Sequence, residues 1–180
     1  MAKGIGLEFR VVAGEDLTAV DHEAVIALCN LAYDEDIGAI IGEFIDPVHV
    51  LGFLDDKLVT HALWITRYLQ PQGLPFLRTA YVEAVATHPD FQHRGFASAI
   101  MKKVVAEIQD FDIAGLAPFN VDFYARLGWE VWRGPLFERK DGELIASPVD
   151  ERVMVYRLPN TPELDLDTAV SIEWRVGEVW

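Results

Sequence analysis

The sequence predicts one α/β domain of the α+β kind, with a mixed, mostly antiparallel central sheet flanked by helices. Two observations predict this fold. Segments with strand-like alternation recur along the chain, and segments with helical three-and-four spacing separate several of them. No linker, repeat or low-complexity stretch divides residues 1–180, so a single domain is expected. With 180 residues and 51% hydrophobic content, the chain is long enough to bury one core.

Capping residues and turn formers set the limits of the elements in the first half. Asp16 or Asp21 can cap a helix, because a carboxylate accepts from the free amides of the first turn. Asp46-Pro47 ends a second helix, since proline disfavours helical backbone in the residue before it. Asp55-Asp56 separates two alternating segments and predicts a hairpin turn. In order, the expected elements are a strand at 7–13, a helix to about Tyr33, a short helix near 39–45, and hairpin strands at 49–54 and 57–69.

The second half is read in the same way. Apolar residues four apart, from Phe96 to Ile108, indicate an amphipathic helix. Gly128 suits the end of a short helix, and Asp141-Gly142 suits a turn between strands. In order, the expected elements are a strand at 76–87, a helix at 95–109, a strand at 113–117, a short helix at 120–127, and strands at 129–137 and 151–158 that flank the turn.

The charge balance narrows the classes of partner. The net charge of −14 comes from 29 acidic and 15 basic side chains. It disfavours nucleic acid, whose binding depends on Lys and Arg, and it suits a cationic small molecule. No apolar run reaches the ~18 residues of a membrane span, and no signal-like N-terminus is seen, so a cytoplasmic protein is expected. The single cysteine, Cys29, falls on an apolar helix face as a core residue. The histidines lack metal-ligand spacing, so no metal is expected.

The most informative motif is Gln92-His93-Arg94-Gly95-Phe96-Ala97, which lies between an expected strand and an expected helix. Free amides and the helix dipole at such a position both favour anionic oxygen. The motif lacks the glycines of a dinucleotide fingerprint and the Gly-Lys-Ser/Thr of a Walker loop. A lone glycine here is also consistent with an ordinary turn. The functional interpretation is that this motif binds a phosphate-bearing ligand.

Two motifs together give a family resemblance. Gln92-x-x-Gly95-x-Ala97 resembles the acetyl-CoA pyrophosphate loop of the GCN5-related N-acetyltransferases (GNAT). At the expected distance downstream, Asn120 and the run Phe123 to Trp129 resemble the superfamily's helix with the pattern F-Y-x-x-x-G-[F/W]. Two spaced motifs in the right order are much rarer by chance than either one alone. The chain is therefore identified as a member of this superfamily.

Further segments are similar to the aminoglycoside 2′-N-acetyltransferases. They are 81–86 (YVEAVA), 128–135 (GWEVWRGP) and the tail 166–180, so the likeness covers roughly Leu69 to Trp180. The chain departs from that family in several places. Glu173 and Glu178 stand where Asp is usual, Ala84 and Thr87 replace Gly and Val, and Asp34-Glu35-Asp36 only approximates its acidic substrate-binding segment.

The resemblance implies acetyl transfer from acetyl-CoA to an amine. It implies a bulge near Glu83–Val85 that leaves the Val85 amide for the acetyl carbonyl, and a Thr87 backbone that binds the pantetheine arm. It also places the Tyr124 hydroxyl near the sulfur, where it protonates the thiolate or hydrogen-bonds to it. The remaining cofactor-binding residues so implied are Gln92, His93, Arg94, Gly95, Phe96, Ala97 and Asn120.

A carboxylate is expected to accept the amine's proton, directly or through a water. Glu83 is the first candidate and, by resemblance, the terminal carboxylate of Trp180 is the second. A carboxyl with a pKa near ~4 is a weak base for an ammonium, which favours the water relay. The residues expected to bind the other ammonium and hydroxyl groups of the substrate are Asp36, Glu83, Asp150, Glu173, Glu178 and Trp180.

The favoured function is acetylation of the 2′-amino group of aminoglycosides in a ternary complex, and thus antibiotic resistance. The resemblance also implies a homodimer. A second hypothesis keeps the fold and cofactor but acetylates another amine, such as a polyamine or an antibiotic intermediate. A third is a non-catalytic module that binds acyl-CoA or a cationic drug. The presence of Tyr124 and Glu83 with an intact loop counts against the third.

Overall fold

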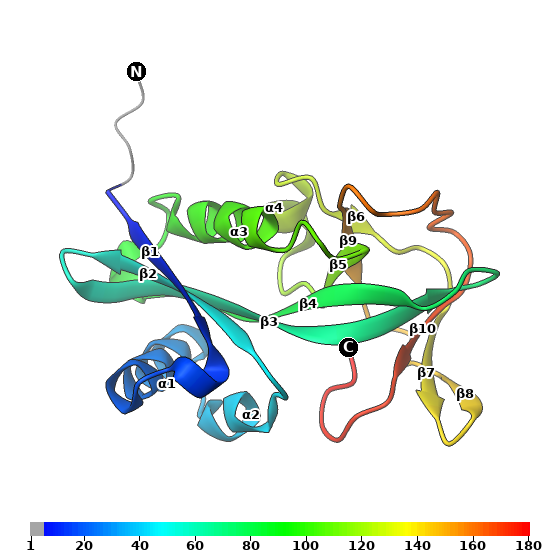
Figure 1. Ribbon diagram of the computed structural model, residues 1–180, viewed down its shortest axis with the longest axis horizontal. Helices are drawn as coiled ribbons and strands as arrows, with labels where there is room; N and C mark the ends of the chain where they lie inside the picture. Colours follow the sequence, from blue (N-terminus) through cyan, green and yellow to red (C-terminus); the bar gives the residue numbers. More distant parts are fainter. Residues whose placement is uncertain (1–5) are drawn as a thin grey trace. The chain divides into compact units, whose positions relative to one another are not determined.

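The computed structural model describes residues 6–180 and divides into two compact units (Figure 1). Unit 1 contains the chain up to Ile65 together with Val82–Glu107, and unit 2 contains Thr66–Tyr81 together with Ile108–Trp180. The division falls within two long strands, β3 (Lys57–Pro71) and β4 (Leu77–Thr87), so each strand contributes residues to both units.

Unit 1 is a small antiparallel sheet with helices on both of its sides (Figure 1). β2 pairs antiparallel with β1 and with β3. Besides residues 57–65 of β3 and 82–87 of β4, its elements are β1 (Glu8–Ala13), the 3-10 helix η1 (Gly14–Asp16), α1 (Ala19–Tyr33), α2 (Gly38–Glu43), β2 (Val48–Leu54), the 3-10 helix η2 (Pro89–Phe91) and α3 (Phe96–Glu107). One core cluster joins α1, α2, β2 and β4 through Val25, Leu28, Cys29, Ile37, Ile41, Leu51 and Ala86. Cys29 is thus the core residue that its helix face predicted.

The start of α1 differs from the expectation. Its N-cap is Thr18, whose hydroxyl oxygen accepts from the Asp21 amide at 3.1 Å, and not Asp16 or Asp21. Asp21 lies in the first turn, where its carboxylate pairs with Arg10 at 2.6 Å. Threonine and aspartate are both good caps, so spacing alone did not separate them. The hairpin turn at Asp55-Asp56 is confirmed, because both residues have the positive φ of a type I′ turn, 48° and 61°.

Unit 2 contains a mixed sheet and one short helix. β5 pairs parallel with β4 and antiparallel with β9, and β9 pairs antiparallel with β6. β10 pairs antiparallel with the end of β3 and parallel with β7, which pairs antiparallel with β8. Besides the parts of β3 and β4, the elements are β5 (Ile113–Leu116), α4 (Val121–Ala125), β6 (Glu130–Val131), β7 (Leu136–Lys140), β8 (Glu143–Ala146), β9 (Met154–Arg157) and β10 (Val170–Glu173). Most of these pairings are antiparallel, as the sequence predicted.

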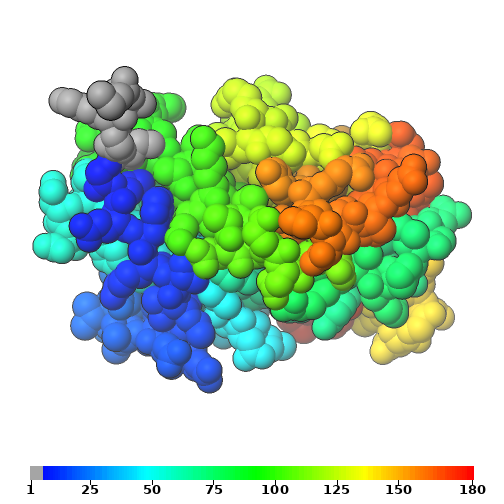
Figure 2. Space-filling view, turned by 45° about the horizontal axis from the view of Figure 1, so that its top comes forward, coloured from blue at the N-terminus to red at the C-terminus, as the bar shows by residue number. Residues whose placement is uncertain are grey.

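The strands around Asp141-Gly142 were assigned incorrectly. The turn joins β7 to β8, and this hairpin is seen at the surface in golden yellow in Figure 2. The expected strand at 129–137 is broken at Gly134, where an added Cβ would lie 1.9 Å from the Thr168 carbonyl oxygen. β8 and β10 were not predicted. Among residues 6–180, no helix is both long enough and apolar enough to cross a membrane.

Candidate functional site

The expected phosphate-binding loop enters α3 in unit 1. His93 and Gly95 have positive φ, 60° and 84°, so the chain turns sharply just before the helix. The amide of Ala99 donates to the Gly95 carbonyl at 3.0 Å, which closes the first helical turn. The amides before Ala99 therefore belong to the set that a helix leaves for outside partners. This geometry fits a pyrophosphate, and His93, Arg94 and Gly95 are exposed there.

Aromatic and cationic side chains support the loop. The Gln92 side chain donates to the Thr87 carbonyl at 3.4 Å and so joins the loop to the end of β4. The Arg94 guanidinium lies 5.0 Å from the centre of the Phe91 ring, and the Lys57 ammonium lies 5.1 Å from the same centre. Lys57 was not predicted, because it comes from the β2–β3 hairpin and no local motif contains it. The Phe91 ring thus lies within about 5 Å of two cationic groups next to the loop.

The expected irregularity in β4 occurs at Ala84. This residue has φ 49° in the middle of a strand, a left-handed conformation that costs a non-glycine residue about 1 kcal/mol. Glycine would adopt this conformation without that cost. This explains the glycine that the aminoglycoside 2′-N-acetyltransferases have at this position. Two side chains bind the carbonyls here, since His61 donates to Ala84 at 2.9 Å and the Tyr33 hydroxyl donates to Val85 at 3.1 Å. Glu83, which precedes Ala84 in the chain, is partly buried.

Unit 2 carries Tyr124 on α4. The N-cap of that helix is Asn120, whose side-chain oxygen accepts from the Phe123 amide at 3.0 Å, so Asn120 orients the helix. The Tyr124 ring packs against Phe123 and Trp129 at centroid distances of 4.9 and 6.1 Å. Burial raises the pKa of Tyr124 to about 12. The hydroxyl therefore stays protonated at neutral pH and can act as a donor.

Carboxylates converge elsewhere in unit 2. Burial raises the pKa of Glu151, and the negative charges of Glu178, Asp150 and Glu138 raise it further. The structure therefore brings two predicted substrate-binding residues, Asp150 and Glu178, near Glu151 although they are 28 positions apart in the chain. Glu138 and Glu151 were missed. Glu151 follows Asp150 directly, so the sequence could have indicated it. Glu138 on β7 has no acidic neighbour or motif beside it that would have indicated it.

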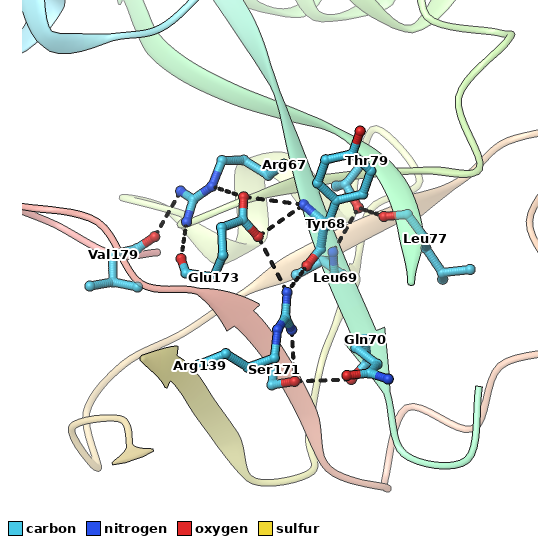
Figure 3. A network of polar contacts seen from close by, with 10 residues as sticks. All are labelled: Arg67, Tyr68, Leu69, Gln70, Leu77, Thr79, Arg139, Ser171, Glu173 and Val179. Atoms are coloured by element: carbon cyan, nitrogen blue, oxygen red, sulfur yellow. Dashed lines mark hydrogen bonds and ion pairs between the residues drawn. The ribbon is translucent and has the colours of Figure 1, made fainter. Parts of the chain in front are cut away.

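Glu173 is held inside a network of its own, drawn in Figure 3. Its carboxylate accepts from the Arg67 Nε at 2.6 Å, from the Tyr68 amide at 3.0 Å, and from Arg139 at 3.4 Å. Arg67 also donates to the main-chain carbonyls of Glu173 and Val179, at 2.5 and 2.9 Å. The carboxylate expected to bind substrate thus anchors the C-terminal tail. Sequence analysis did not anticipate this role, because Arg67 and Glu173 are 106 positions apart.

The two remaining candidates have local partners too. The Trp180 indole is buried and donates to the Ser147 hydroxyl at 2.8 Å, which fixes the last residue of the chain. Asp36 is exposed, and its carboxylate accepts from the Gly38 amide at 3.1 Å at the start of α2 and from the Asn30 side chain at 3.3 Å. Both residues are therefore held by contacts with their own neighbourhood.

Comparisons with known proteins show the family to which the chain belongs. The Acetyltransferase (GNAT) domain family matches residues 15–132. The chain is 30% identical over 158 residues to an aminoglycoside 2′-N-acetyltransferase of Mycolicibacterium fortuitum, with 80% of each chain covered.

Solved structures share the fold at low identity. The GNAT family N-acetyltransferase YhbS of Escherichia coli, in complex with CoA, has a TM-score of 0.68 and 14% identity over 97% of this chain and 93% of that chain. Escherichia coli ElaA has a TM-score of 0.58 and 15% identity over 84% of this chain and 99% of that chain. Together with the family match, these likenesses establish that the chain belongs to the GNAT acetyltransferases, enzymes that use acetyl-CoA.

Proposed function

We propose that this enzyme acetylates the 2′-amino group of an aminoglycoside-like cation by direct transfer in a ternary complex. The observation that carries the proposal is the negative charge that Glu138, Asp150 and Glu178 place around Glu151, because a substrate with several ammonium groups is attracted by several carboxylates in one region. The relative of known substrate class, at 30% identity, supports it. A role in antibiotic resistance, a cytoplasmic location and a homodimer are parts of the same proposal.

Unit 1 supplies the proposed cofactor contacts. Acetyl-CoA brings the acetyl group as an activated thioester. The backbone of the loop 92–97, with the Arg94 side chain, binds its pyrophosphate, and the Thr87 backbone binds its pantetheine arm. The Val85 amide donates to the acetyl carbonyl as negative charge develops on that oxygen. The left-handed backbone at Ala84 supports this assignment, since such a residue interrupts regular strand pairing.

Carboxylates supply the proposed base. Glu83 accepts the amine's proton through a water, and the terminal carboxylate of Trp180 is the second candidate. Asp36, Asp150 and Glu178 bind the other ammonium and hydroxyl groups of the substrate. Glu173 acts through its contacts with Arg67 and so positions the tail rather than holding an ammonium.

Tyr124 is proposed to stabilise the thiolate leaving group by a hydrogen bond. With the pKa of Tyr124 at about 12 and a thiol pKa of about 8.5, full proton transfer to the thiolate is uphill by roughly 5 kcal/mol. A hydrogen bond from the retained proton carries no such cost. The pKa of Tyr124 thus favours donation over transfer.

Tyr124→Phe is expected to lower kcat about 10- to 100-fold, as the loss of one donor to developing charge does, with KM for acetyl-CoA nearly unchanged. Steady-state kinetics measure both constants. Tyr156→Phe is the matched control, because Tyr156 packs against the same Trp129 ring at 5.6 Å and has no proposed role. A Tyr124→Phe enzyme with kcat within about twofold of the wild type would remove Tyr124 from the mechanism.

Glu151→Gln is expected to raise KM for the cationic substrate about fivefold, the effect of losing roughly 1 kcal/mol of charge attraction. Its melting temperature at pH 7 should rise. The raised pKa of Glu151 means that its ionised form is disfavoured in the folded state, so this group loses stability as pH rises through its titration range. Glu163→Gln, an exposed site in the same unit, changes the net charge equally and should alter neither property. A lower KM in Glu151→Gln would contradict a cation-binding cluster.

The proposal is tested by release of CoA thiol from acetyl-CoA across a panel of amines. The panel contains aminoglycosides with a 2′-amino group, with a 2′-hydroxyl group or with no substituent there, and spermidine. Turnover confined to the 2′-amino compounds is expected. Turnover of spermidine alone would favour acetylation of another small amine, and binding of acetyl-CoA without turnover of any amine would favour a non-catalytic module.

A further inference from the structure

Three successive carbonyls of β4 accept hydrogen bonds from side chains of unit 1. The Ala84 carbonyl accepts from His61 Nδ1 at 2.9 Å, the Val85 carbonyl from the Tyr33 hydroxyl at 3.1 Å, and the Ala86 carbonyl from the Thr60 hydroxyl at 2.9 Å. In a regular strand these carbonyls would bond to amides of neighbouring strands. Side chains therefore support the backbone of β4 at the left-handed residue and at the two residues after it.

The protonation of His61 follows from its partners. A carbonyl only accepts, so His61 Nδ1 carries the hydrogen that reaches Ala84. The other ring nitrogen, Nε2, is then the acceptor, and it lies 3.0 Å from His49 Nδ1. His49 therefore donates from Nδ1 to His61, and both neutral rings have the same Nδ1–H tautomer. The chain of donors runs from His49 through His61 to Ala84.

The two rings lie in the core. His61 is 0% exposed and His49 is 2% exposed, so water does not compete for these bonds. Burial lowers the pKa of His49 to about 4 and that of His61 to about 3, which keeps both rings neutral at physiological pH. The Cys29 sulfur lies 3.7 Å from His61 Nδ1, and its thiol pKa is raised by burial to about 12, so it brings no charge.

We propose that His61, held by His49, is a positioning residue that fixes the Ala84 carbonyl and with it the left-handed backbone of β4. The neighbouring backbone groups of Val85 and Thr87 are the ones assigned to the acetyl carbonyl and the pantetheine arm, so the functional consequence rests on the proposed function. Thr60 supports the same segment, because its hydroxyl lies 3.0 Å from the Thr87 hydroxyl as well as bonding to Ala86.

The first test needs no variant and no substrate. Two-dimensional NMR that correlates ring nitrogens with ring protons assigns the tautomer of each histidine in the wild-type protein. At pH 7, His49 and His61 are expected to carry the hydrogen on Nδ1, and His61 is expected to stay neutral down to pH 5. An Nε2–H tautomer of His61, or a protonated ring at pH 6, would overturn the proposal.

The second test compares variants of His61. His61→Leu removes the donor to Ala84, whereas His61→Asn retains one, because the asparagine amide nitrogen replaces Nδ1. In His61→Leu the Val85 amide resonance should shift, CoA affinity measured by calorimetry should fall about fivefold, and kcat should fall about 10- to 100-fold with KM for the amine little changed. His61→Asn should recover CoA affinity to within about twofold, and kcat to within about fivefold, of the wild type. His22→Leu, an exposed histidine on α1, should change none of these.

These readouts separate the two proposals. If the wild-type enzyme acetylates no aminoglycoside, the proposed function fails, yet ring tautomers, the Val85 resonance and CoA affinity still decide the role of His61. A folded His61→Leu protein with unchanged Val85 resonance and CoA affinity would overturn the positioning role. If His61→Leu does not fold, the comparison of His61→Asn with the wild type and the tautomer assignment decide it.

Discussion

Arg67→Met is expected to lower the free energy of unfolding by about 3 kcal/mol, because it removes the buried partner of an ion pair whose other side chain, Glu173, is partly exposed. Arg67 is 4% exposed, and its guanidinium binds the Glu173 carboxylate and the main-chain carbonyls of Glu173 and Val179. A methionine fills much of the space but leaves those oxygens without this donor. Urea unfolding at pH 7 measures the loss, and limited proteolysis shows whether the tail is released.

An exposed ion pair provides the control for this prediction. Arg133 binds the Asp167 carboxylate through two guanidinium nitrogens at 2.6 and 2.7 Å, but both side chains are more than half exposed. Arg133→Met should therefore change stability little, because water and salt weaken exposed pairs. Equal losses in the two variants would show that burial of Arg67 does not set the strength of its network.

Lowering the pH from 7 to 5 is expected to reduce the free energy of unfolding by roughly 4 kcal/mol. His49 and His61 have pKa values of about 4 and 3 in the folded protein, and an unfolded histidine has about 6.5. Between these values the unfolded chain binds two protons that the folded chain does not. The stability is thus fully present above pH 6.5 and is lost as the pH falls toward the folded pKa values.

The groups around the two histidine rings show which residues cause the loss of stability at low pH. His61 faces His49 on β2, Cys29 on α1 and the Ala84 carbonyl on β4, while the charge of His22 on α1 lowers the pKa of His49. Urea midpoints at pH 7, 6 and 5 at constant ionic strength measure the loss. A double variant, His49→Gln with His61→Asn, should show less than about a quarter of it, since neither ring remains to titrate. A wild-type protein whose stability does not change between pH 7 and 5 would contradict this account.

Local chemistry made much of the fold predictable. The Asp55-Asp56 turn, the amphipathic spacing of α3 and the loop at 92–97 are set by residues close in sequence, and each expected element is present there. The strands after Gly128 were harder to predict, because their partners are not their neighbours in sequence alone: β6 pairs with β9, and β7 pairs with both β8 and β10. Strands as short as β6, with two residues, show no periodicity that a sequence pattern could reveal.

The elements that carry the site candidates were predictable where motifs are contiguous. Gly95 and Tyr124 fall on the elements that their motifs indicated, a helix N-terminus and a short helix. The residues that support them were not predictable, because their contacts join distant positions. Arg67 meets Glu173, and His61 meets His49 and Ala84, through pairings that only the folded chain creates. Sequence analysis therefore named groups proposed to touch ligands and missed those that hold them in place.

The central claim, acetylation at a 2′-amino group, is tested most directly by the structure of the product. Two aminoglycosides that differ only in a 2′-amino against a 2′-hydroxyl group are incubated with the enzyme and acetyl-CoA, and NMR locates any acetyl group. The account predicts one acetyl amide on the 2′-nitrogen of the first compound and no product from the second. Acetylation of both compounds at another nitrogen, or of neither while acetyl-CoA binds, would contradict it.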